Sequence, residues 1–487
     1  MVFSSIIFLN LFLPVFLLVY LAVPTRFKNP VLILASSLFY AWGAPKVLPL
    51  LFLTTWIDYW CSRKFQNRDK SERKWLWLSV MVNILSLAWF KYSNFFVGEL
   101  NRLNQYFGEE PLAWTAIALP IGISFFTFQK ISYLVDVWQK RAEPPESLWQ
   151  YLLFVICFPQ LIAGPIVRFH DIADQLKVRK HTIDSVFEGC SRFLIGLGKK
   201  VLIANPLAWV ADTIFALGTD TLPCHYAWLG IICYAMQIYF DFSGYSDMAI
   251  GLGRMIGFKF PENFNHPYIS RNITEFWRRW HITLSEWMKL YLYIPLGGNR
   301  SGKLKTYFNL WIVFLLSGFW HGASWNFIAW GAFHGFFLVV DKLYWQKLSL
   351  AMPRVLSTSI TFIIVLFGWV LFRAETLPQA LSYAYQMLDF SDFGEAHHWM
   401  LTGELLQNRT RLVLALALLF SFAPAFSLKN FQAPKDSASE LIYKPFGLNP
   451  SGAVSSTLIG TTTLAILLLC TMSLVSASFN PFIYFRF

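Results

Sequence analysis

The sequence predicts an all-α integral membrane protein that crosses the bilayer many times. Of its 487 residues, 56% are hydrophobic and 14% are charged, whereas about 25% of the residues in a soluble domain are charged. The chain also contains a long apolar run, Leu310 to Val340, without a single Asp, Glu, Lys or Arg. A bilayer core is the usual surrounding of such a run. We therefore expect about eleven transmembrane helices, together with shorter re-entrant or interfacial helices.

The predicted membrane segments follow one another along the whole chain. In the first half they cover residues 3–23, 30–60, 75–98, 112–135, 150–167, 186–218 and 226–257. We expect the second of these to divide into two helices near Gly43 and Pro45, because glycine and proline favour helix ends. In the second half they cover residues 306–340, 355–374, 411–426 and 453–478, after a polar, aromatic stretch from 259 to 305.

No change in composition marks a soluble domain or a linker, so we predict one membrane domain over residues 1–487. Within it, N-terminal helices occupy residues 1–257. A core over 259–345 contains the polar stretch, whose Trp, Tyr, Arg and Lys content is typical of an interfacial or re-entrant segment. A last helix with the tail FIYFRF occupies residues 453–487.

The basic residues indicate how the chain is oriented in the membrane. The chain has 40 Lys and Arg against 28 Asp and Glu, a net charge of +12. Most of the basic residues lie in short links between apolar segments, as cytoplasmic loops do, so we do not expect a nucleic-acid partner. Links 61–74, 341–354 and 427–450 contain lysines, whereas link 375–408 has no Lys or Arg. We therefore place that link and the C-terminal tail on the exported face.

The run from Leu310 to Val340 contains a candidate functional residue, His321. As one straight helix this run would be about 46 Å long, against a hydrocarbon thickness of roughly 30 Å. We expect it to tilt, break or fold back, with the break near Gly318 and Gly322. His321 would then lie at the break, inside the membrane. A titratable ring at that depth is costly unless it has partners or lines a wet cavity, which suggests a functional site.

The stretch TEFWRRWHITLSEWMKLYLYIPLGGNR, from Thr274 to Arg300, contains a second histidine, His281. On one continuous helix, His281 would share a face with Trp277, Arg278 and Ser285. Such a face could border a funnel for an anionic headgroup. Taken alone, each of His281 and His321 is explained equally well as a buried packing residue and as a catalytic residue.

The stretch YFDFSGYSDMAIGLGRMIG, from Tyr239 to Gly257, places two carboxylates in an apolar run. Asp241 and Asp247 are costly there unless they face a polar interior. The glycine spacing differs from the dinucleotide-binding fingerprint, and no strand precedes it. We instead expect Gly253 and Gly257 to allow close helix packing.

Several of these motifs, in this order, resemble the membrane-bound O-acyltransferase family and, within it, the bacterial alginate O-acetylation branch. The similar stretches are MVFSSIIFLNLFLPVF at the N-terminus, SFFTFQKISYLVDVW at 124–138, FPQLIAGPIVRF at 158–169, YFDFSGYSDMAIGLG at 239–253, FWRRWHITLSEWMKLYLYIPLGGNR at 276–300 and SGFWHGASWNF at 317–327. The resemblance implies a ring of helices around a thin partition with a central tunnel. It also implies that His321 is the catalytic histidine and that His281 occupies a second family position within the catalytic core 259–345.

The resemblance further implies a donor, partners and a location. The donor would be acetyl-coenzyme A, a substrate rather than a tightly bound cofactor, and no metal is expected. Arg278, Arg279, Lys289 and Arg300 are candidates for binding its phosphates, although each also suits an interfacial anchor. An exported transferase would complete O-acetylation of an envelope or secreted polysaccharide. The chain would lie among the lipids of a bacterial inner membrane.

The tail FIYFRF is similar to the C-terminal motif of the small partner protein in teichoic-acid D-alanylation. In that system an aromatic tail enters the exported mouth of the tunnel. This similarity suggests that Tyr484 accepts the acyl group and presents it outside. The alternative interpretation is that the aromatic residues of the tail anchor it at the membrane interface.

Three alternatives remain open at this stage. D-alanyl transfer is the alternative within the enzyme class. A channel or secondary transporter would also explain many helices and buried polar groups, although we find no paired, interrupted helices in two repeated halves. A scaffold for an envelope-modifying complex would leave both histidines without a catalytic role.

Overall fold

The structure is a computed structural model that describes residues 1–65, 69–218, 222–300, 302–391, 403, 405–423, 453–476 and 480. These ranges consist of helices and loops and contain no strand. The predicted all-α class is therefore confirmed. The chain forms two compact units, one of Met1–Val186 with Leu252–Pro261, the other of Phe187–Gly251 with the residues from Glu262 onward.

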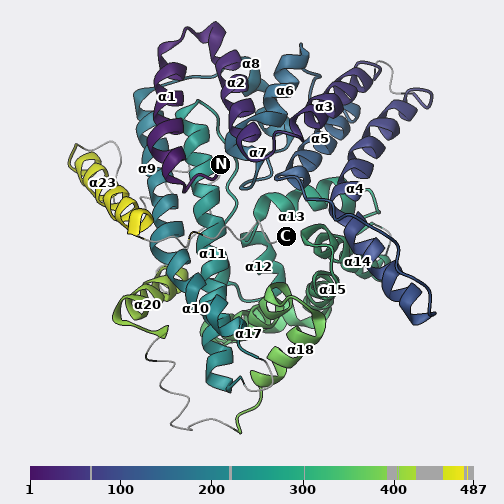
Figure 1. The fold of residues 1–487 in the computed structure, drawn as a ribbon, viewed down its shortest axis with the longest axis vertical. Helices are drawn as coiled ribbons and strands as arrows, with labels where there is room; N and C mark the ends of the chain where they lie inside the picture. The colour runs from purple at the N-terminus through teal and green to yellow at the C-terminus, as the bar shows by residue number, and fades with distance from the viewer. Residues whose placement is uncertain are drawn as a thin grey trace. The chain divides into compact units, whose positions relative to one another are not determined.

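The first unit contains the helices α1 to α8 and the first residues of α9 (Figure 1). They are α1 (Leu13–Ala22), α2 (Thr25–Gly43), α3 (Leu48–Ser62), α4 (Arg73–Tyr106), α5 (Ile123–Trp138), α6 (Leu148–Ile156), α7 (Phe158–Leu161), α8 (Phe169–Lys177) and α9 (Ile183–Gly198). A π-helical turn over Phe8–Phe12 precedes α1. The end of α2 at Gly43 and the start of α3 at Leu48 confirm the division predicted near Gly43 and Pro45.

A buried ion pair lies among four helices of the first unit. The Lys130 Nζ of α5 lies 3.3 Å from the Asp58 Oδ2 of α3, and both side chains are fully buried. Ser79 and Asn83 of α4 donate hydrogen bonds to Asp58 Oδ1, and the Tyr151 hydroxyl of α6 donates to Oδ2. Buried charges are tolerated when they are paired and hydrogen-bonded in this way. The pair therefore ties α3, α4, α5 and α6 together.

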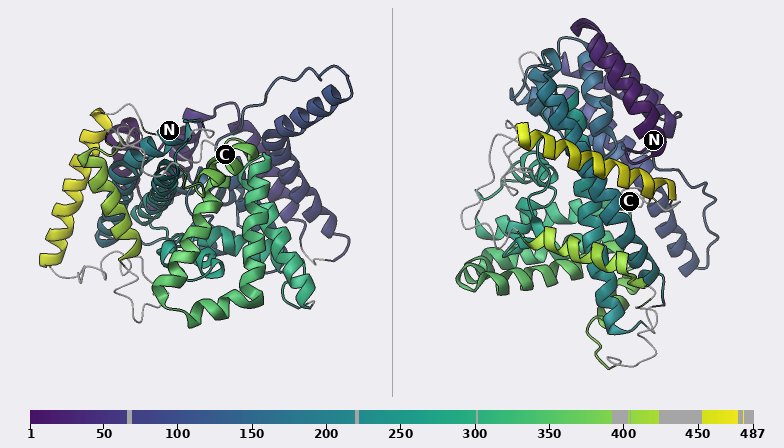
Figure 2. Two further views of the ribbon diagram at one scale, coloured as in Figure 1. Left: turned by 90° about the horizontal axis from the view of Figure 1, so that it is seen from below. Right: turned by 90° about the vertical axis from the view of Figure 1, so that its left-hand side faces the viewer.

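The second unit contains most of α9 and the later helices (Figure 2). They are α10 (Asn205–Phe215), α11 (Cys224–Met255, whose last residues belong to the first unit), α12 (Ile273–Arg279), α13 (Ile282–Met288), α14 (Lys303–His321), α15 (Trp325–Val340), α16 (Gln346–Ala351), α17 (Arg354–Arg373), α18 (Leu377–Gln386), α20 (Asn408–Phe422) and α23 (Ala453–Ser476). π-helical segments cover Lys199–Ala204, Lys289–Tyr293 and Asp341–Trp345.

Helices α14 and α15 form a tight hairpin within this unit. A Cβ atom on Gly318 would lie 2.2 Å from the Phe327 carbonyl oxygen, and one on Gly331 would lie 2.3 Å from the Phe314 carbonyl oxygen. Only glycine allows the two backbones to approach so closely. The hairpin confirms that the apolar run from Leu310 to Val340 breaks and folds back.

Glycines also bring α9 and α11 together, but not the glycines that we predicted. A Cβ atom on Gly244 would lie 2.7 Å from the Gly196 carbonyl oxygen, and one on Gly251 would lie 2.6 Å from the Gly189 carbonyl oxygen. Gly257, by contrast, follows the end of α11 with a φ of +85°. The prediction for Gly257 was therefore wrong, because this glycine terminates the helix instead of packing inside it.

Five helices in the described ranges are long and apolar enough to cross a membrane: Arg73–Tyr106, Ile183–Phe215, Trp325–Ala351, Arg354–Arg373 and Thr457–Ser476. A shorter apolar helix covers Phe8–Ala22. These helices fit a multi-pass membrane protein, and the total of about eleven stays a prediction.

Two predicted segments differ from the structure. Segment 112–135 becomes helical only from Ile123, after Pro120 and a Gly122 whose φ is +80°. Segment 150–167 is divided into α6, which ends at Ile156, and the single turn of α7. Apolar composition alone does not separate continuous helices from such interrupted ones.

Candidate active site

His321 is the last residue of α14, at the point where the hairpin turns. Gly322 follows it in an extended conformation, and α15 begins at Trp325. A Cβ atom on Gly322 would lie 2.1 Å from the Phe327 ring, so the turn requires glycine at this position. The predicted break therefore occurs directly after His321.

Aromatic rings surround His321. The centroid of its ring lies 4.8 Å from that of Trp320, 5.1 Å from Trp330 and 5.3 Å from Phe372. Its exposed fraction is 7%, so the residue is buried but not completely enclosed. A ring in such a setting is held in one orientation, as a catalytic base requires.

The hairpin turn is fixed by hydrogen bonds next to His321. Asn326 donates from its side-chain amide to the Ala374 carbonyl oxygen and accepts at Oδ1 from the Ser324 hydroxyl, at 2.9 Å. These two contacts tie the Asn326 side chain to the Ala374 backbone and to the Ser324 side chain at the hairpin turn. The first-turn amides of α15 carry the positive end of the helix dipole and lie close to His321 in the sequence.

His281 lies between two short helices instead of within one. Its φ of +46° and ψ of 53° place it in the left-handed region, after the end of α12 at Arg279 and before the start of α13 at Ile282. The prediction that it shares one helix face with Trp277, Arg278 and Ser285 was therefore wrong. Left-handed backbone is strained for residues with a Cβ atom, and strained residues of this kind cluster at active sites and ligand-binding segments.

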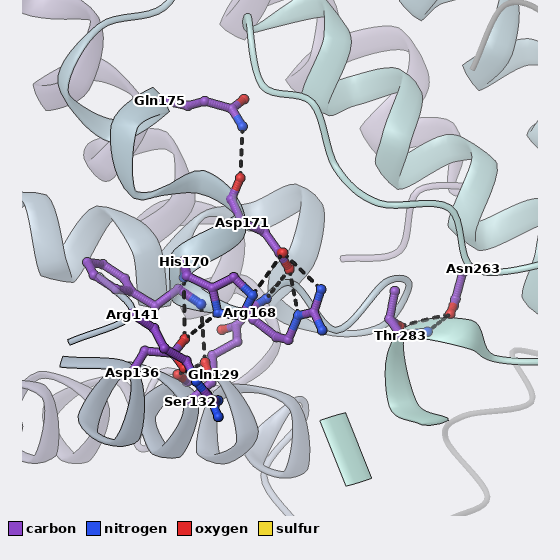
Figure 3. A network of polar contacts seen from close by, with 11 residues as sticks. Gln129, Ser132, Asp136, Arg141, Arg168, His170, Asp171, Gln175, Asn263 and Thr283 are labelled. Carbon is purple, nitrogen blue, oxygen red and sulfur yellow. Dashed lines mark hydrogen bonds and ion pairs between the residues drawn. The ribbon is translucent and has the colours of Figure 1, made fainter. Parts of the chain in front are cut away.

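Asn263 holds the His281 ring in place. Its Oδ1 lies 3.0 Å from His281 Nδ1 and 2.9 Å from the Thr283 hydroxyl, while its Nδ2 donates to the Ser246 hydroxyl at 3.1 Å. Figure 3 shows the contact between Asn263 and Thr283. With an oxygen opposite Nδ1, His281 donates its proton there, which leaves the lone pair on Nε2. Nε2 is buried and has no hydrogen-bond partner among the described residues.

A chain of aromatic contacts within the second unit links the two histidines. From His321 it runs through Trp330 to Trp369, at centroid distances of 5.1 and 6.4 Å. It then continues from Trp369 to Trp280, Phe264, Phe242 and His281 at 4.8, 5.1, 4.9 and 4.7 Å. The two sequence-predicted histidines therefore belong to one aromatic core.

The two carboxylates of α11 are buried and paired with cations, which gives them the polar surroundings that a carboxylate in an apolar run needs. Asp247 Oδ1 accepts from Arg192 at 2.7 Å, and its Oδ2 lies 2.6 Å from Lys199 Nζ. Asp241 lies 2.8 Å from Lys200. Arg192 also pairs with Glu262, the residue before Asn263. Sequence reasoning found the carboxylates but not their partners, which come from α9 and the π-helical segment after it.

Of the four cations predicted to bind the donor, one is paired with a carboxylate and three are exposed. Arg279 lies 2.9 Å from Glu275 and donates to the Asn265 carbonyl oxygen, so its charge already has a partner. Arg278, Lys289 and Arg300 are exposed. Tyr484, the predicted acyl carrier, lies outside the described residues.

His334 is a third buried histidine that sequence reasoning passed over. It lies on α15, with its ring 5.0 Å from Trp330, which also contacts His321. The Trp277 indole nitrogen lies 3.4 Å from its Nδ1. Because His334 lies in the same apolar run as His321, its position in the sequence does not indicate a second functional residue. It packs the hairpin against α12.

The motifs at 124–138 and 158–169 meet in a polar network of the first unit, which Figure 3 shows. His170 Nδ1 lies 2.7 Å from Asp136 Oδ2, and Arg168 forms two hydrogen bonds with Asp171, at 2.9 and 3.0 Å. The Ser132 hydroxyl accepts from the Phe169 backbone amide. These contacts join α5 to the start of α8 and give both motifs a structural explanation.

The chain is similar to known proteins over its whole length. The family model for the membrane-bound O-acyltransferase family matches residues 43–382. A probable alginate O-acetylase of Azotobacter vinelandii is 44% identical, with 100% of each chain covered. A peptidoglycan O-acetyltransferase of Helicobacter pylori is 38% identical over 88% of this chain and 87% of its own. A teichoic acid D-alanyltransferase of Bacillus subtilis is 29% identical over 52% and 69%.

Proposed function

Because the chain belongs to the membrane-bound O-acyltransferase family, we propose that it transfers an acetyl group across the bacterial inner membrane. The donor is cytoplasmic acetyl-coenzyme A, and an exported transferase places the acetyl group on an extracellular or envelope polysaccharide such as alginate. Full-length similarity to probable alginate O-acetylases, at 44% identity, supports acetyl transfer. The likeness to a D-alanyltransferase covers 52% of the chain, so D-alanyl transfer is the weaker candidate.

The position of His321 at the hairpin turn is the observation that carries this proposal. His321 acts as general base: it takes the proton from the attacking hydroxyl, the oxygen bonds to the acetyl carbon, and the carbon–sulfur bond of the thioester breaks. The departing thiolate then receives the proton. A base of this kind contributes about 10² to 10⁴ in rate. Amides at the start of α15 stabilise the oxyanion.

His281 and the exposed cations have supporting roles in the proposal. His281 offers the lone pair of Nε2 within the same aromatic core, and Asn263 fixes the direction of its ring. Arg278, Lys289 and Arg300 attract the phosphates of the donor. Arg279 contributes less, because Glu275 already balances its charge.

Tyr484 passes the acetyl group to the exported side. A thiol has a pKa of about 8.5 and a phenol a pKa of about 10, so an acyl group moves from thioester to tyrosyl ester without a steep uphill step. Tyr484→Phe keeps the aromatic ring and removes only the hydroxyl. Unchanged transfer in this variant would assign Tyr484 to membrane anchoring.

The test uses membrane vesicles that contain the full chain, labelled acetyl-coenzyme A and the acceptor polysaccharide with its exported transferase. His321→Ala is expected to abolish labelling of the polysaccharide while the protein level stays normal. His334→Ala is the matched control, because it removes a buried ring from the same hairpin. Normal labelling with His321→Ala, or equal loss in both variants, would overturn the role of His321. Labelling from a D-alanyl donor but not from acetyl-coenzyme A would favour D-alanyl transfer.

A further inference from the structure

Three basic side chains of the first unit gather around Tyr20, near the end of α1. His181 Nε2 lies 3.0 Å from the Tyr20 hydroxyl and Arg179 Nη2 lies 3.4 Å from it. Lys28 Nζ donates to the Tyr20 carbonyl oxygen at 2.7 Å and lies 4.7 Å from the centre of the Tyr20 ring. The residues come from α1, α2 and the link between α8 and α9, so the fold brings them together from distant parts of the sequence.

No carboxylate in the described part of the chain pairs with these three basic side chains. The remaining contacts of Arg179 are neutral: the Asn29 side-chain oxygen, the Gln175 carbonyl oxygen and the face of the Phe258 ring, at 4.3 Å. Its Nε is buried and has no acceptor there. Burial, and then the charges of Lys28 and Arg179, hold the pKa of His181 below its usual value. The cluster therefore keeps a positive potential that no carboxylate of the described residues neutralises.

Other cations of the same unit do have acidic partners. Lys177, two residues before Arg179, pairs with Glu146 at 2.8 Å. Arg168 pairs with Asp171 at 2.9 Å. A basic cluster without such a partner, at the end of membrane helices, has the charge to bind an anion from outside the chain.

An apolar groove of about 870 Å³ lies between α2, α3 and α6 of the same unit. Its volume is within the roughly 300–1,000 Å³ of typical ligand sites. Along α2 it is lined by Asn29, Ile33 and Ser37, and on the opposite side by residues that include Trp56 and Trp149. Asn29 belongs to both features, since it lines the groove and accepts a hydrogen bond from Arg179. The basic cluster therefore lies next to one end of the groove.

We infer that this site binds one anionic glycerophospholipid, with its phosphate at Lys28, Arg179 and His181 and one acyl chain in the groove. Both parts of the site match the ligand: the cations match the phosphate, and the apolar walls match the chain. Location agrees as well. The first turns of α2, with Arg26 and Lys28, and the end of α8 with the link after it, residues 177–181, are basic. The positive-inside rule places such segments on the cytoplasmic side, where anionic lipids attract basic clusters.

The test measures lipid retention by the purified full chain in nanodiscs of phosphatidylcholine that contain a minor fraction of phosphatidylglycerol. Native mass spectrometry counts each bound lipid. We expect phosphatidylglycerol to be retained about tenfold more than its share of the bilayer, because each basic residue adds to the attraction. Lys28→Gln combined with Arg179→Gln is expected to remove this preference. Lys74→Gln, an exposed lysine at the start of α4, is the matched control and is expected to keep it.

A second variant tests the groove without changing the cations. Ser37→Trp fills the groove from α2 and is expected to lower retention of phosphatidylglycerol, so the inference stays testable if the double variant fails to fold. Equal retention of the two lipids by the unmodified chain would overturn the inference. Binding of inorganic phosphate at this cluster without any preference for phosphatidylglycerol would also overturn it, because the cations would then form a site for soluble phosphates.

Discussion

The Nδ1 atom of His281 lies 3.0 Å from the Oδ1 atom of Asn263. This contact holds a ring whose backbone is in the left-handed region, at a φ of +46°. Asn263 also bonds to Ser246 on α11, so α11 determines the direction of the ring through one amide. The pair suggests that Asn263 is a positioning residue for His281.

Asn263→Ala is expected to lower the rate of acetyl transfer about 10²-fold, because a small displacement of a positioned group has an effect of that size. The KM for acetyl-coenzyme A should change little. Asn263→Asp keeps an acceptor for Nδ1–H and should restore much of the rate. Asn299→Ala, at an exposed asparagine, is the control. Initial rates with purified protein measure the effect, and a wild-type rate for Asn263→Ala would contradict the positioning role.

Gly331→Ala is expected to destabilise the hairpin that carries His321. The new Cβ atom would lie 2.3 Å from the Phe314 carbonyl oxygen, so α14 and α15 must separate. Overpacking of this kind costs about 1–3 kcal/mol of unfolding free energy. Gly460→Ala is the matched control, since a Cβ atom there has nothing within 4 Å. Thermal unfolding in detergent should show a lower midpoint for Gly331→Ala and an unchanged or higher one for Gly460→Ala. The reverse order would contradict the close approach.

Lys130→Met is expected to destabilise the first unit strongly. It leaves the Asp58 carboxylate buried without its cation, which typically costs about 3–5 kcal/mol. Adding Asp58→Asn removes the uncompensated charge and should recover most of the stability. Arg102→Met is the control, because Arg102 and Glu99 form an exposed pair, and such pairs contribute about 1 kcal/mol or less. Equal stability of the Lys130 and Arg102 variants would show that the buried pair contributes no more to the free energy of unfolding than the exposed pair does.

The sequence predicted those parts of the structure that depend on local composition. The lack of charge over Leu310–Val340, together with Gly318 and Gly322, predicted a break close to His321, and α14 ends at that residue. Gly43 and Pro45 likewise predicted the division between α2 and α3. In both places a glycine or proline interrupts an apolar run longer than one span.

The parts that depend on distant contacts were not predictable in the same way. The residues next to His281 in the sequence do not indicate a left-handed backbone at this position. Asn263, which holds the ring through a tertiary contact, is eighteen positions away. The cost of placing Asp247 in an apolar run indicated polar surroundings, but only the packing of α9 on α11 brings Arg192 to it. The Tyr20 cluster was missed for the same reason, because its residues are about 160 positions apart.

Binding of phosphatidylglycerol is expected to strengthen as the pH falls from about 7 to about 5. The groups that face His181 are Tyr20 from α1, Lys28 from α2 and Arg179 from its own link, and burial together with the two cations lowers its pKa. At neutral pH His181 is therefore uncharged, and below its pKa it adds a third positive charge. A bound phosphate favours the charged form and raises that pKa, so binding and protonation assist each other. The gain should be about fivefold for one added charge. Lipid retention measured across this pH range should rise for the unmodified chain and stay level for His181→Asn. A rise of the same size in His181→Asn would mean that another group titrates.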